Sequence, residues 1–185
     1  MAEPTASHNS LTVEEYLTLE EGATIRHEYL SGEIFAMVGA TKRHNRIVGN
    51  IFGHLWGAAR SGDCRVYSEG LKLRVADDVI YYPDVMVACG PEGEDPLVED
   101  DPCLVVEVAS PSTELTDRRE KLVAYRRMPS LRAYVIVAQD RRWVESHLRG
   151  DDSVWRRGDL VDEGRLSVPC PETTLTLAEI YEGLE

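Results

Sequence analysis

An almost wholly apolar run from Tyr134 to Ala138 is the feature that most constrains the fold of this chain. A strand with apolar residues on both sides must be covered on both faces, as at the centre of a layered domain. Apolar residues at helical spacing predict a long helix over 43–60, and residues 114–128 predict a second helix. Strand-like runs separate these helices. This order predicts an α/β domain of the α+β kind, with a mixed central β-sheet flanked by helices.

The length of 185 residues fits one domain of ordinary size. Residues 1–11 are small and polar and are expected to form a flexible N-terminus, so the domain should span 12–185. Thr12 and Glu15 have the spacing of a capping box at the start of a short helix. The further strands are predicted at 34–38, 64–67, 71–75, 79–82, 84–88, 104–109, 143–148 and 154–157, and a closing helix at 175–184.

The charge balance excludes some classes of protein. The chain has 20 Lys and Arg against 33 Asp and Glu, a net charge of −13, which disfavours broad attraction to nucleic acid or anionic lipid. No apolar run approaches the ~20 residues that cross a bilayer, so no membrane partner is expected. The N-terminus lacks the pattern of a secretion signal. We therefore expect a cytoplasmic protein.

The four cysteines stand far apart in the sequence and form no Cys-x-x-Cys pair. This spacing argues against a zinc site and against a disulfide framework. In a cytosolic chain such cysteines are expected to pack as buried free thiols. They are Cys64, Cys89, Cys103 and Cys170.

Two carboxylates occupy strongly apolar strand-like surroundings. Asp84 opens an apolar run after Pro83, and Glu107 lies within the run from Leu104 to Ala109. A buried carboxylate is costly unless a cation neutralises it, and no Lys or Arg occurs between Arg74 and Arg118. Each acid could instead face water at a strand end or pair with a distant arginine. Together on neighbouring strands, they would form a hard oxygen site suited to Mg²⁺ or Mn²⁺.

The predicted second helix offers a cation to this site. Asp117, Lys121 and Tyr125 are spaced four residues apart and would share one helix face. Asp117 and Lys121 would also make an ordinary surface ion pair, worth only about 0.3–0.5 kcal/mol. The short link after Glu107 turns the helix back toward the strand, where Lys121 could reach a phosphate or a metal-bound water.

These residues together resemble the PD-(D/E)XK nuclease superfamily and, more narrowly, the Uma-type family of restriction endonucleases, over roughly residues 11–182. The resemblance implies a restriction-endonuclease-like core. It is carried by the order and spacing of 28–33, His44, 83–85, 106–113, Asp117, Lys121 and Tyr125.

The resemblance implies a role for each matching position. Asp84, Glu107 and the backbone carbonyl of Val108 would bind a divalent metal, which polarises the scissile phosphate and lowers the pKa of the attacking water. The superfamily's motif lysine should occupy position 109, where this chain has Ala109. Lys121 matches the place to which the Uma-type relatives move this lysine.

Four further residues have assignments of their own. Glu28 resembles the extra N-terminal glutamate that binds the metal or water in many relatives. Glu33 competes for that role, although its position after a Ser-Gly turn favours a solvated edge. His44 could bond a phosphate or carboxylate, or could satisfy backbone groups at the edge of the core. Tyr125 is expected to be a packing residue with a hydroxyl group.

The predicted function is a metal-dependent phosphodiester hydrolase acting on DNA, with Asp84, Glu107, Lys121, Glu28 and His44 in the site. The alternatives are a catalytically weak or silent interaction module and a hydrolase of small phosphoesters. Arginines in 118–132, 141–142 and 156–157, with Trp143 and Trp155, could contact phosphates or could balance the acidic loop at 90–102. A homodimer would suit an enzyme that cuts two strands.

Overall fold

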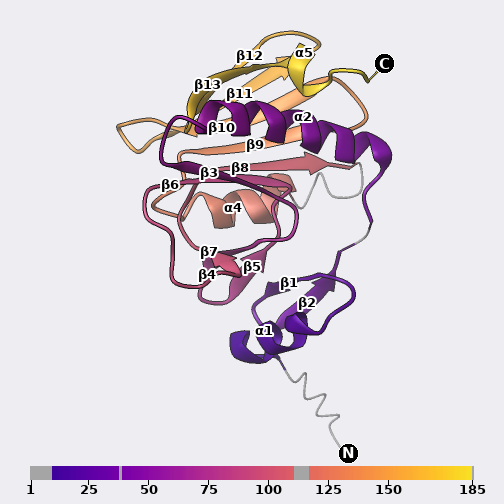
Figure 1. The fold of residues 1–185 in the computed structure, drawn as a ribbon, viewed down its shortest axis with the longest axis vertical. Coiled ribbons are helices and arrows are strands. Elements are labelled where there is room, and N and C mark those ends of the chain that lie inside the picture. The colour runs from indigo at the N-terminus through magenta and orange to yellow at the C-terminus, as the bar shows by residue number, and fades with distance from the viewer. Residues whose placement is uncertain (1–9, 38, 111–116, 185) are drawn as a thin grey trace, which may run out of the picture.

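The computed structural model describes residues 10–37, 39–110 and 117–184. Its centre is a six-stranded mixed sheet (Figure 1). The strands, in their order across the sheet, are β11 (Trp155–Val161), β10 (Trp143–Arg149), β9 (Ala133–Ala138), β8 (Pro102–Ala109), β6 (Val85–Cys89) and β3 (Cys64–Ser68). β8 and β9 pair in parallel, and the other neighbours pair antiparallel.

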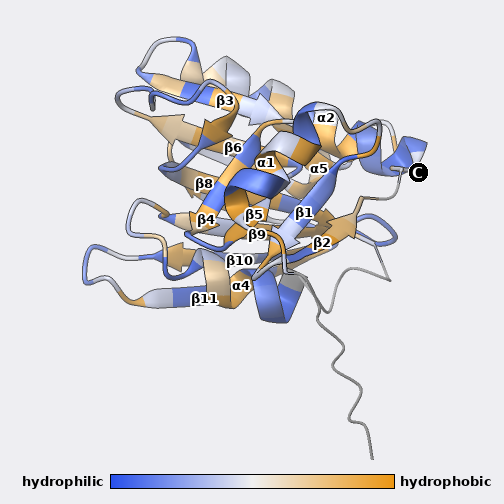
Figure 2. Ribbon diagram, turned by 90° about the horizontal axis from the view of Figure 1, so that it is seen from below, coloured by the Kyte–Doolittle hydropathy of each residue, from blue (hydrophilic) through white to orange (hydrophobic). Residues whose placement is uncertain are grey.

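Alternation along each strand divides the core into two layers. Along β6, Val85 and Val87 pack in one cluster, whereas Met86 packs in the other. The first cluster is covered by helix α2 (Lys42–Ala59), whose buried residues are Ile47, Val48, Ile51, Leu55 and Ala59. The C-terminal hairpin of β12 (Arg165–Pro169) and β13 (Glu172–Thr176), followed by α5 (Leu177–Ile180), covers the same face. Hydrophobic strands lie inside this arrangement (Figure 2).

The opposite face of the central sheet carries the elements that build the site. They are the π-helical turn η1 (Asp117–Lys121), helix α4 (Leu122–Tyr125) and a five-stranded sheet. In order across that sheet, its strands are β2 (Glu33–Ala36), β1 (His27–Leu30), β5 (Val79–Tyr81), β4 (Lys72–Ala76) and β7 (Val98–Glu99). Helix α1 (Val13–Glu21) packs against β1 through Tyr16 and Tyr29.

Most predicted elements are present. The mixed α+β prediction is confirmed, the capping box of Thr12 and Glu15 starts α1, and the predicted helix over 43–60 is α2. The second helix differs, because residues 117–121 form a π-helical turn and α4 ends at Tyr125. Residues 1–9 and 111–116, on which part of the predictions fell, lie outside the described residues.

Some expectations for the C-terminal third and the acidic loop are wrong. The strands of the β12–β13 hairpin lie where no strand was expected, and the closing helix shortens to α5. The acidic segment 90–102 is mostly exposed, but Val98 and Glu99 are buried because they pair with β4 as β7. Among the described residues, no helix has both the length and the apolar character needed to cross a membrane.

The expectation of free thiols is also wrong. Cys64 is disulfide-bonded to Cys89, and Cys103 to Cys170. The first pair forms because the antiparallel register of β3 and β6 places Cys64 directly opposite Cys89. The second links β8 to the end of the C-terminal hairpin, across 67 residues. Strand register decides the first pairing and the packing of the C-terminal hairpin on the central sheet decides the second, and the spacing of cysteines in the sequence reveals neither.

Candidate active site

Asp84 lies in the short turn that joins β5 to β6, so its side chain sits where the central sheet begins. Its Oδ2 atom accepts a hydrogen bond of 2.6 Å from the backbone N–H of Val108 in β8. The same oxygen lies 3.2 Å from Nε2 of His44. Among the described residues, all side-chain contacts of Asp84 thus use Oδ2, and they bring β8 and α2 to one carboxylate.

His44 stands in the first turn of α2, where the hydroxyl of Thr41 caps the backbone N–H of His44 at 3.0 Å. Burial alone would lower the pKa of His44, but the hydrogen bond and charge of Asp84, with the charge of Glu69, leave that pKa raised. Its Nδ1 atom is buried and has no hydrogen-bond partner among the described residues. The imidazole is therefore held on Asp84, with its second nitrogen uncommitted.

Glu69 is a neighbour of the site that the sequence analysis missed. One ligand atom each from His44, Glu69 and Asp84 lies within 4.8 Å of the others, a grouping that could hold a metal ion. Glu69 follows β3 with a φ of +23°, and its backbone N–H donates to the Asp84 carbonyl at 3.2 Å. The sequence signal was a Glu-Gly turn after a strand, which occurs too widely to identify a ligand.

Glu107 is the buried acid on the other side of the site, with an exposed fraction of 4%. Its Oε1 atom accepts hydrogen bonds from Lys121 Nζ at 3.1 Å and from Tyr125 Oη at 2.9 Å. Burial and the nearby charge of Glu107 raise the pKa of Tyr125 well above its ordinary value, so its hydroxyl remains a donor. Tyr125 is therefore both a packing residue, as expected, and a hydrogen-bond partner of Glu107.

Lys121 enters the site from η1 and is 7% exposed. Its ammonium group lies between two carboxylates, at 3.1 Å from Glu107 Oε1 and 2.9 Å from Glu28 Oε1. It also lies 5.1 Å from the centre of the Tyr81 ring. Lys121 therefore points inward rather than into solvent. The side chain of Asp117, expected on the same helix face, lies outside the described part of the chain.

The structure separates Glu28 from its competitor. Glu28 lies on β1, where it bonds Lys121 and its Oε1 atom is 3.5 Å from the backbone N of Tyr82. Glu33 lies at the start of the edge strand β2 and is exposed. Of these two acids, Glu28 is the one brought to Lys121.

The backbone of β8 joins the two halves of the site. In a paired strand, the N–H and C=O of one residue point to the same neighbouring strand. Because the Val108 N–H meets Asp84, its carbonyl oxygen also faces that side. The position of the superfamily's motif lysine is Ala109, which is buried and carries no charge. The carboxylates of Asp84 and Glu107 and this carbonyl are hard ligands of the kind that Mg²⁺ or Mn²⁺ prefers. The described group whose oxygen and nitrogen ligand atoms lie within 4.8 Å of one another is His44, Glu69 and Asp84.

The arginines in 118–132, 141–142 and 156–157 form a basic cluster, and two of them pair with a buried glutamate. Both Arg118 and Arg157 lie 3.1 Å from Oε2 of the buried Glu145, whose Oε1 is 2.7 Å from His147 Nε2. The acidic loop instead pairs with other arginines, in the ion pairs Arg65–Glu92 and Arg74–Asp100. These two ion pairs do not support the alternative in which the arginines of 118–132, 141–142 and 156–157 balance this loop.

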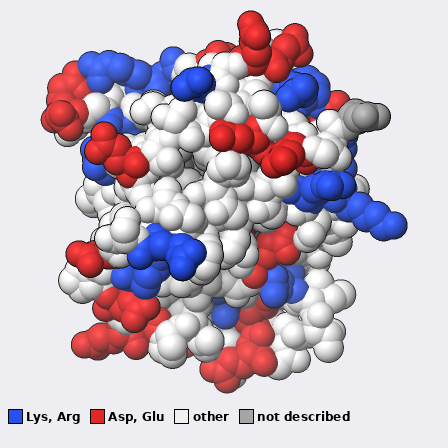
Figure 3. Space-filling model, turned by 45° about the horizontal axis from the view of Figure 1, so that its top comes forward, with Lys and Arg blue, Asp and Glu red and all other residues white. Residues whose placement is uncertain are grey.

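Arginines also stack on the two tryptophans of this region. Arg118 lies 4.4 Å from the ring centre of Trp143, and Arg149 lies 4.8 Å from that of Trp155. These contacts form a stacked arginine–tryptophan face along β10 and β11. Acidic and basic side chains are interspersed on the face of the molecule shown in Figure 3. The net negative charge is thus not a single acidic field on that face.

Comparison with known proteins places this chain in a family. Residues 13–178 match the family model described as "Uma2: Putative restriction endonuclease". Two uncharacterized proteins of Synechocystis sp. are similar along most of their lengths. Protein slr1290 is 33% identical over 98% of this chain and 96% of its own, and sll1609 is 32% identical over 85% and 92%.

A solved structure shares the fold. It is the crystal structure of a protein described as "a putative nuclease belonging to DUF820" from Anabaena variabilis. The TM-score is 0.76 at 16% identity, over 92% of this chain and 97% of that chain. The restriction-endonuclease-like expectation for the fold is thereby confirmed. The family match covers most of the chain, and the protein belongs to the Uma2 family of restriction-endonuclease-like proteins.

Proposed function

We propose that this protein is a metal-dependent phosphodiester hydrolase that acts as a DNA endonuclease. The observation that carries the proposal is the position of Lys121. The motif position on β8 holds Ala109, yet an ammonium group reaches Glu107 from η1 at 3.1 Å. A cation is thus present beside the buried acid, although it comes from another backbone element. This substitution maintains the charge pattern of a phosphate-cleaving site.

The metal would be Mg²⁺, or Mn²⁺ in its place, held by Asp84, Glu107 and the carbonyl of Val108. When bound, such an ion polarises a phosphate oxygen and lowers the pKa of a water molecule. Lys121 is placed to stabilise negative charge that develops on the phosphate. Glu28 orients Lys121 through its 2.9 Å ion pair. His44 fixes the orientation of the Asp84 carboxylate.

The DNA part of the proposal is supported by the family description and by the arginine–tryptophan face on β10 and β11. Arginine side chains contact phosphates, and aromatic rings stack on unpaired bases. Arg118 lies one helical turn before Lys121, so this face begins beside the candidate active site. A strand held there would extend toward Glu107.

A second candidate function is favoured by one observation. Glu107 and Lys121 are 4% and 7% exposed, so these two groups are nearly closed to solvent. A closed site suits an interaction module built on a nuclease fold that does not turn over. The two functions differ in whether Asp84 is needed for metal-dependent cleavage.

The test combines calorimetry with cleavage of single- and double-stranded DNA, using the parent protein and Asp84→Asn. We expect Mg²⁺ or Mn²⁺ binding by the parent, metal-dependent cutting by the parent, and loss of both in the variant. Glu33→Gln is the matched control, because it removes one carboxylate charge at an exposed position. It should cut DNA as the parent does.

The remaining outcomes each decide between the candidates. A parent that binds no divalent metal would overturn the metal mechanism and favour the interaction module. Metal binding with no cutting of either DNA form, but with hydrolysis of a small phosphodiester such as bis(p-nitrophenyl) phosphate, would replace the DNA substrate by small phosphoesters. Cutting by Asp84→Asn at the parent's rate would place the chemistry elsewhere.

A further inference from the structure

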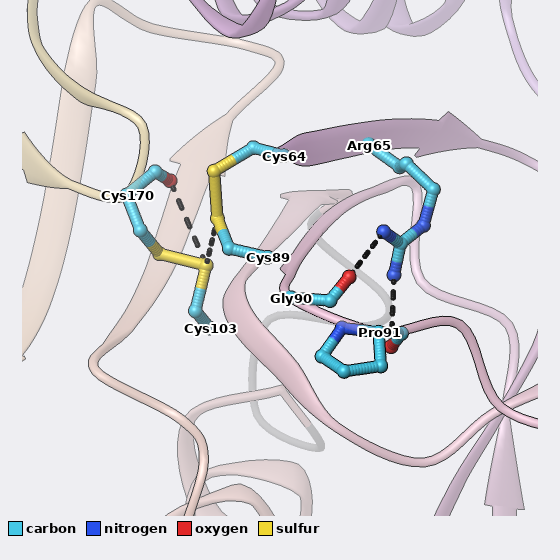
Figure 4. Close-up of a disulfide and its surroundings, with 7 residues drawn as sticks. All are labelled: Cys64, Arg65, Cys89, Gly90, Pro91, Cys103 and Cys170. Atoms are coloured by element: carbon cyan, nitrogen blue, oxygen red, sulfur yellow. Dashed lines mark hydrogen bonds between the residues drawn. A yellow bond between two sulfur atoms is a disulfide. The ribbon is translucent and has the colours of Figure 1, made fainter. Parts of the chain in front are cut away.

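All four cysteines of the chain meet at one place, at the end of β6 opposite to Asp84. Their sulfur atoms form two adjacent disulfides, and the Sγ atoms of Cys89 and Cys103 are 3.5 Å apart (Figure 4). The residues come from the start of β3, the end of β6, the second position of β8 and the residue after β12. Four separate segments thus deliver the four cysteines to a single cluster.

Three of the four cysteines have the composition and spacing of a soft-metal site, and the fourth, Cys64, is bonded to one of them, Cys89. Sulfur atoms of Cys89, Cys103 and Cys170 all lie within 4.8 Å of one another. A tetrahedral zinc site with Zn–S bonds of about 2.3 Å has sulfurs separated by about 3.8 Å. Thiolates select zinc and other soft ions, whereas Mg²⁺ prefers oxygen ligands. The group contains no carboxylate among its described members, in contrast to the site at Asp84.

The surroundings of the cluster fix the ligands and leave one side accessible. Cys103 and Cys170 are 8% and 6% exposed, while Cys64 is half-buried and Cys89 is exposed. A hollow of about 490 Å³ borders the exposed side and is lined by Gly62, Asp63, Cys64, Arg65, Gly90 and Pro91.

Arg65 positions the segment that follows Cys89. Its guanidinium donates to the carbonyl of Gly90 at 2.6 Å and to that of Pro91 at 3.4 Å (Figure 4). Strand β6, which ends at Cys89, is therefore fixed by its pairing with β3 and by the contacts of Arg65 with the loop that follows. A guanidinium beside the cluster would also offset the net negative charge of four thiolates around one divalent ion.

We propose that the reduced protein binds one Zn²⁺ through Cys64, Cys89, Cys103 and Cys170, and that the two disulfides are the oxidised form of this site. Disulfides are rare in reducing compartments, where these side chains would be thiols. A dithiol reductant breaks each S–S bond by exchange. Two dithiols become disulfides, and four cysteine thiols result. Zinc then displaces the thiol protons, which pass to the solvent.

The first test uses the whole protein, reduced with a phosphine under nitrogen and freed of metal with a chelator. Zn²⁺ is titrated in competition with a chromophoric chelator. We expect one tightly bound ion per chain, nanomolar or tighter, as for structural zinc sites. The disulfide form should lack this tight site. Co²⁺ in place of Zn²⁺ should show thiolate charge-transfer absorption, which oxygen ligands at Asp84 cannot give.

Variants separate the two metal sites. Cys89→Ser removes an exposed ligand and should weaken tight zinc binding by more than the roughly 10–100-fold that losing an outer hydrogen-bond partner of a ligand costs. Asp84→Asn is the control, since it alters the oxygen site and should leave the thiolate absorption unchanged. If Cys89→Ser does not fold, alkylation of the parent serves instead. Zinc should protect four thiols, counted by mass spectrometry.

Three results would overturn the proposal. These are zinc binding weaker than micromolar by the fully reduced parent, equal tight binding by Cys89→Ser, or full alkylation of all four thiols in the presence of zinc. None of these results bears on DNA cleavage, so the proposal stands or falls independently of the proposed nuclease function.

Discussion

Strand β6 begins beside a cluster of oxygen ligands and ends in a cluster of sulfur atoms. Asp84 precedes its first residue and Cys89 is its last, a separation of about 16 Å along an extended chain. At the oxygen end, the buried Lys121 forms ion pairs with Glu28 and Glu107. The sulfur cluster is uncharged as long as its disulfides are closed.

The two ends of β6 show two different ways in which a protein can bury potential metal ligands. Carboxylates cannot be buried without a cation, so the site around Glu107 requires Lys121 even before any metal binds. Cysteines can be buried neutral or bonded to one another, so their cluster needs no counter-ion to fold. A substitution at the oxygen end should therefore change ion pairing and catalysis. A substitution at the sulfur end should change the stability that the disulfide cross-links provide.

The largest effect is expected from Asp84→Asn, which should lower metal-dependent DNA cleavage by at least about 10³-fold. In the proposed mechanism this carboxylate is a metal ligand, and in the structure it accepts the hydrogen bond of Val108 N–H. Single-turnover cleavage at saturating Mn²⁺ measures the loss. Zinc binding at the cysteines should not change, and a parallel loss there would show that the two ends of β6 are not independent.

Cys103→Ser should destabilise the disulfide form by about 4 kcal/mol, because the lost link closes a long loop in the unfolded chain. The sequence separation of this pair is 67 residues. Urea unfolding of the parent and the variant without reductant gives the difference. The same pair compared after reduction and removal of metal is the control, and there the difference should fall below about 1 kcal/mol.

Lys121→Met should destabilise the protein by about 3 kcal/mol, because Glu107 would stay buried without its cation. The double variant Glu107→Gln/Lys121→Met should recover most of that loss. Lys42→Met, at an exposed position in the first turn of α2, should change stability by less than about 0.5 kcal/mol. Urea unfolding measures all three. Equal stability of Lys121→Met and the parent would contradict the charge-balance account.

The smallest effect concerns pH. The raised pKa of His44 means that its pairing with Asp84 contributes stability that is fully present below the ordinary histidine pKa. This contribution is lost as pH rises through the folded-state pKa. Unfolding free energy should therefore decline above neutral pH in the parent and decline less in His44→Gln. His54→Gln, an exposed position on the same helix, should keep the parent's slope.

Most of the fold could be predicted because the spacing of apolar residues along the sequence reflects which side chains are buried. The alternation along β6 and the apolar run of β9 follow directly from a sheet covered on both faces. The β12–β13 hairpin was missed although β12 alternates buried Leu166 and Val168 with exposed residues, because β13 has a single buried residue, Leu175, and shows no such alternation. Its position depends on packing against α2, which local sequence does not encode.

The part of the site around Glu107 could be predicted, because a buried carboxylate requires a cation nearby. Glu107 in an apolar strand implied a cation, and Lys121 at a fitting distance along the chain supplied one. Glu69 and the cysteine cluster were not predictable, because each depends on strand register. A one-residue slip between β3 and β6 would turn Cys64 away from Cys89 without changing any sequence pattern.

The ion pairs of Lys121 have a consequence for the order in which the protein matures. Glu28 belongs to the five-stranded sheet and Glu107 to the six-stranded sheet, while Lys121 comes from the segment between β8 and β9. A chain emerging from the ribosome carries the first acid long before the lysine is synthesised. The three groups can meet only after both sheets have formed and docked, so an incomplete chain holds no assembled site.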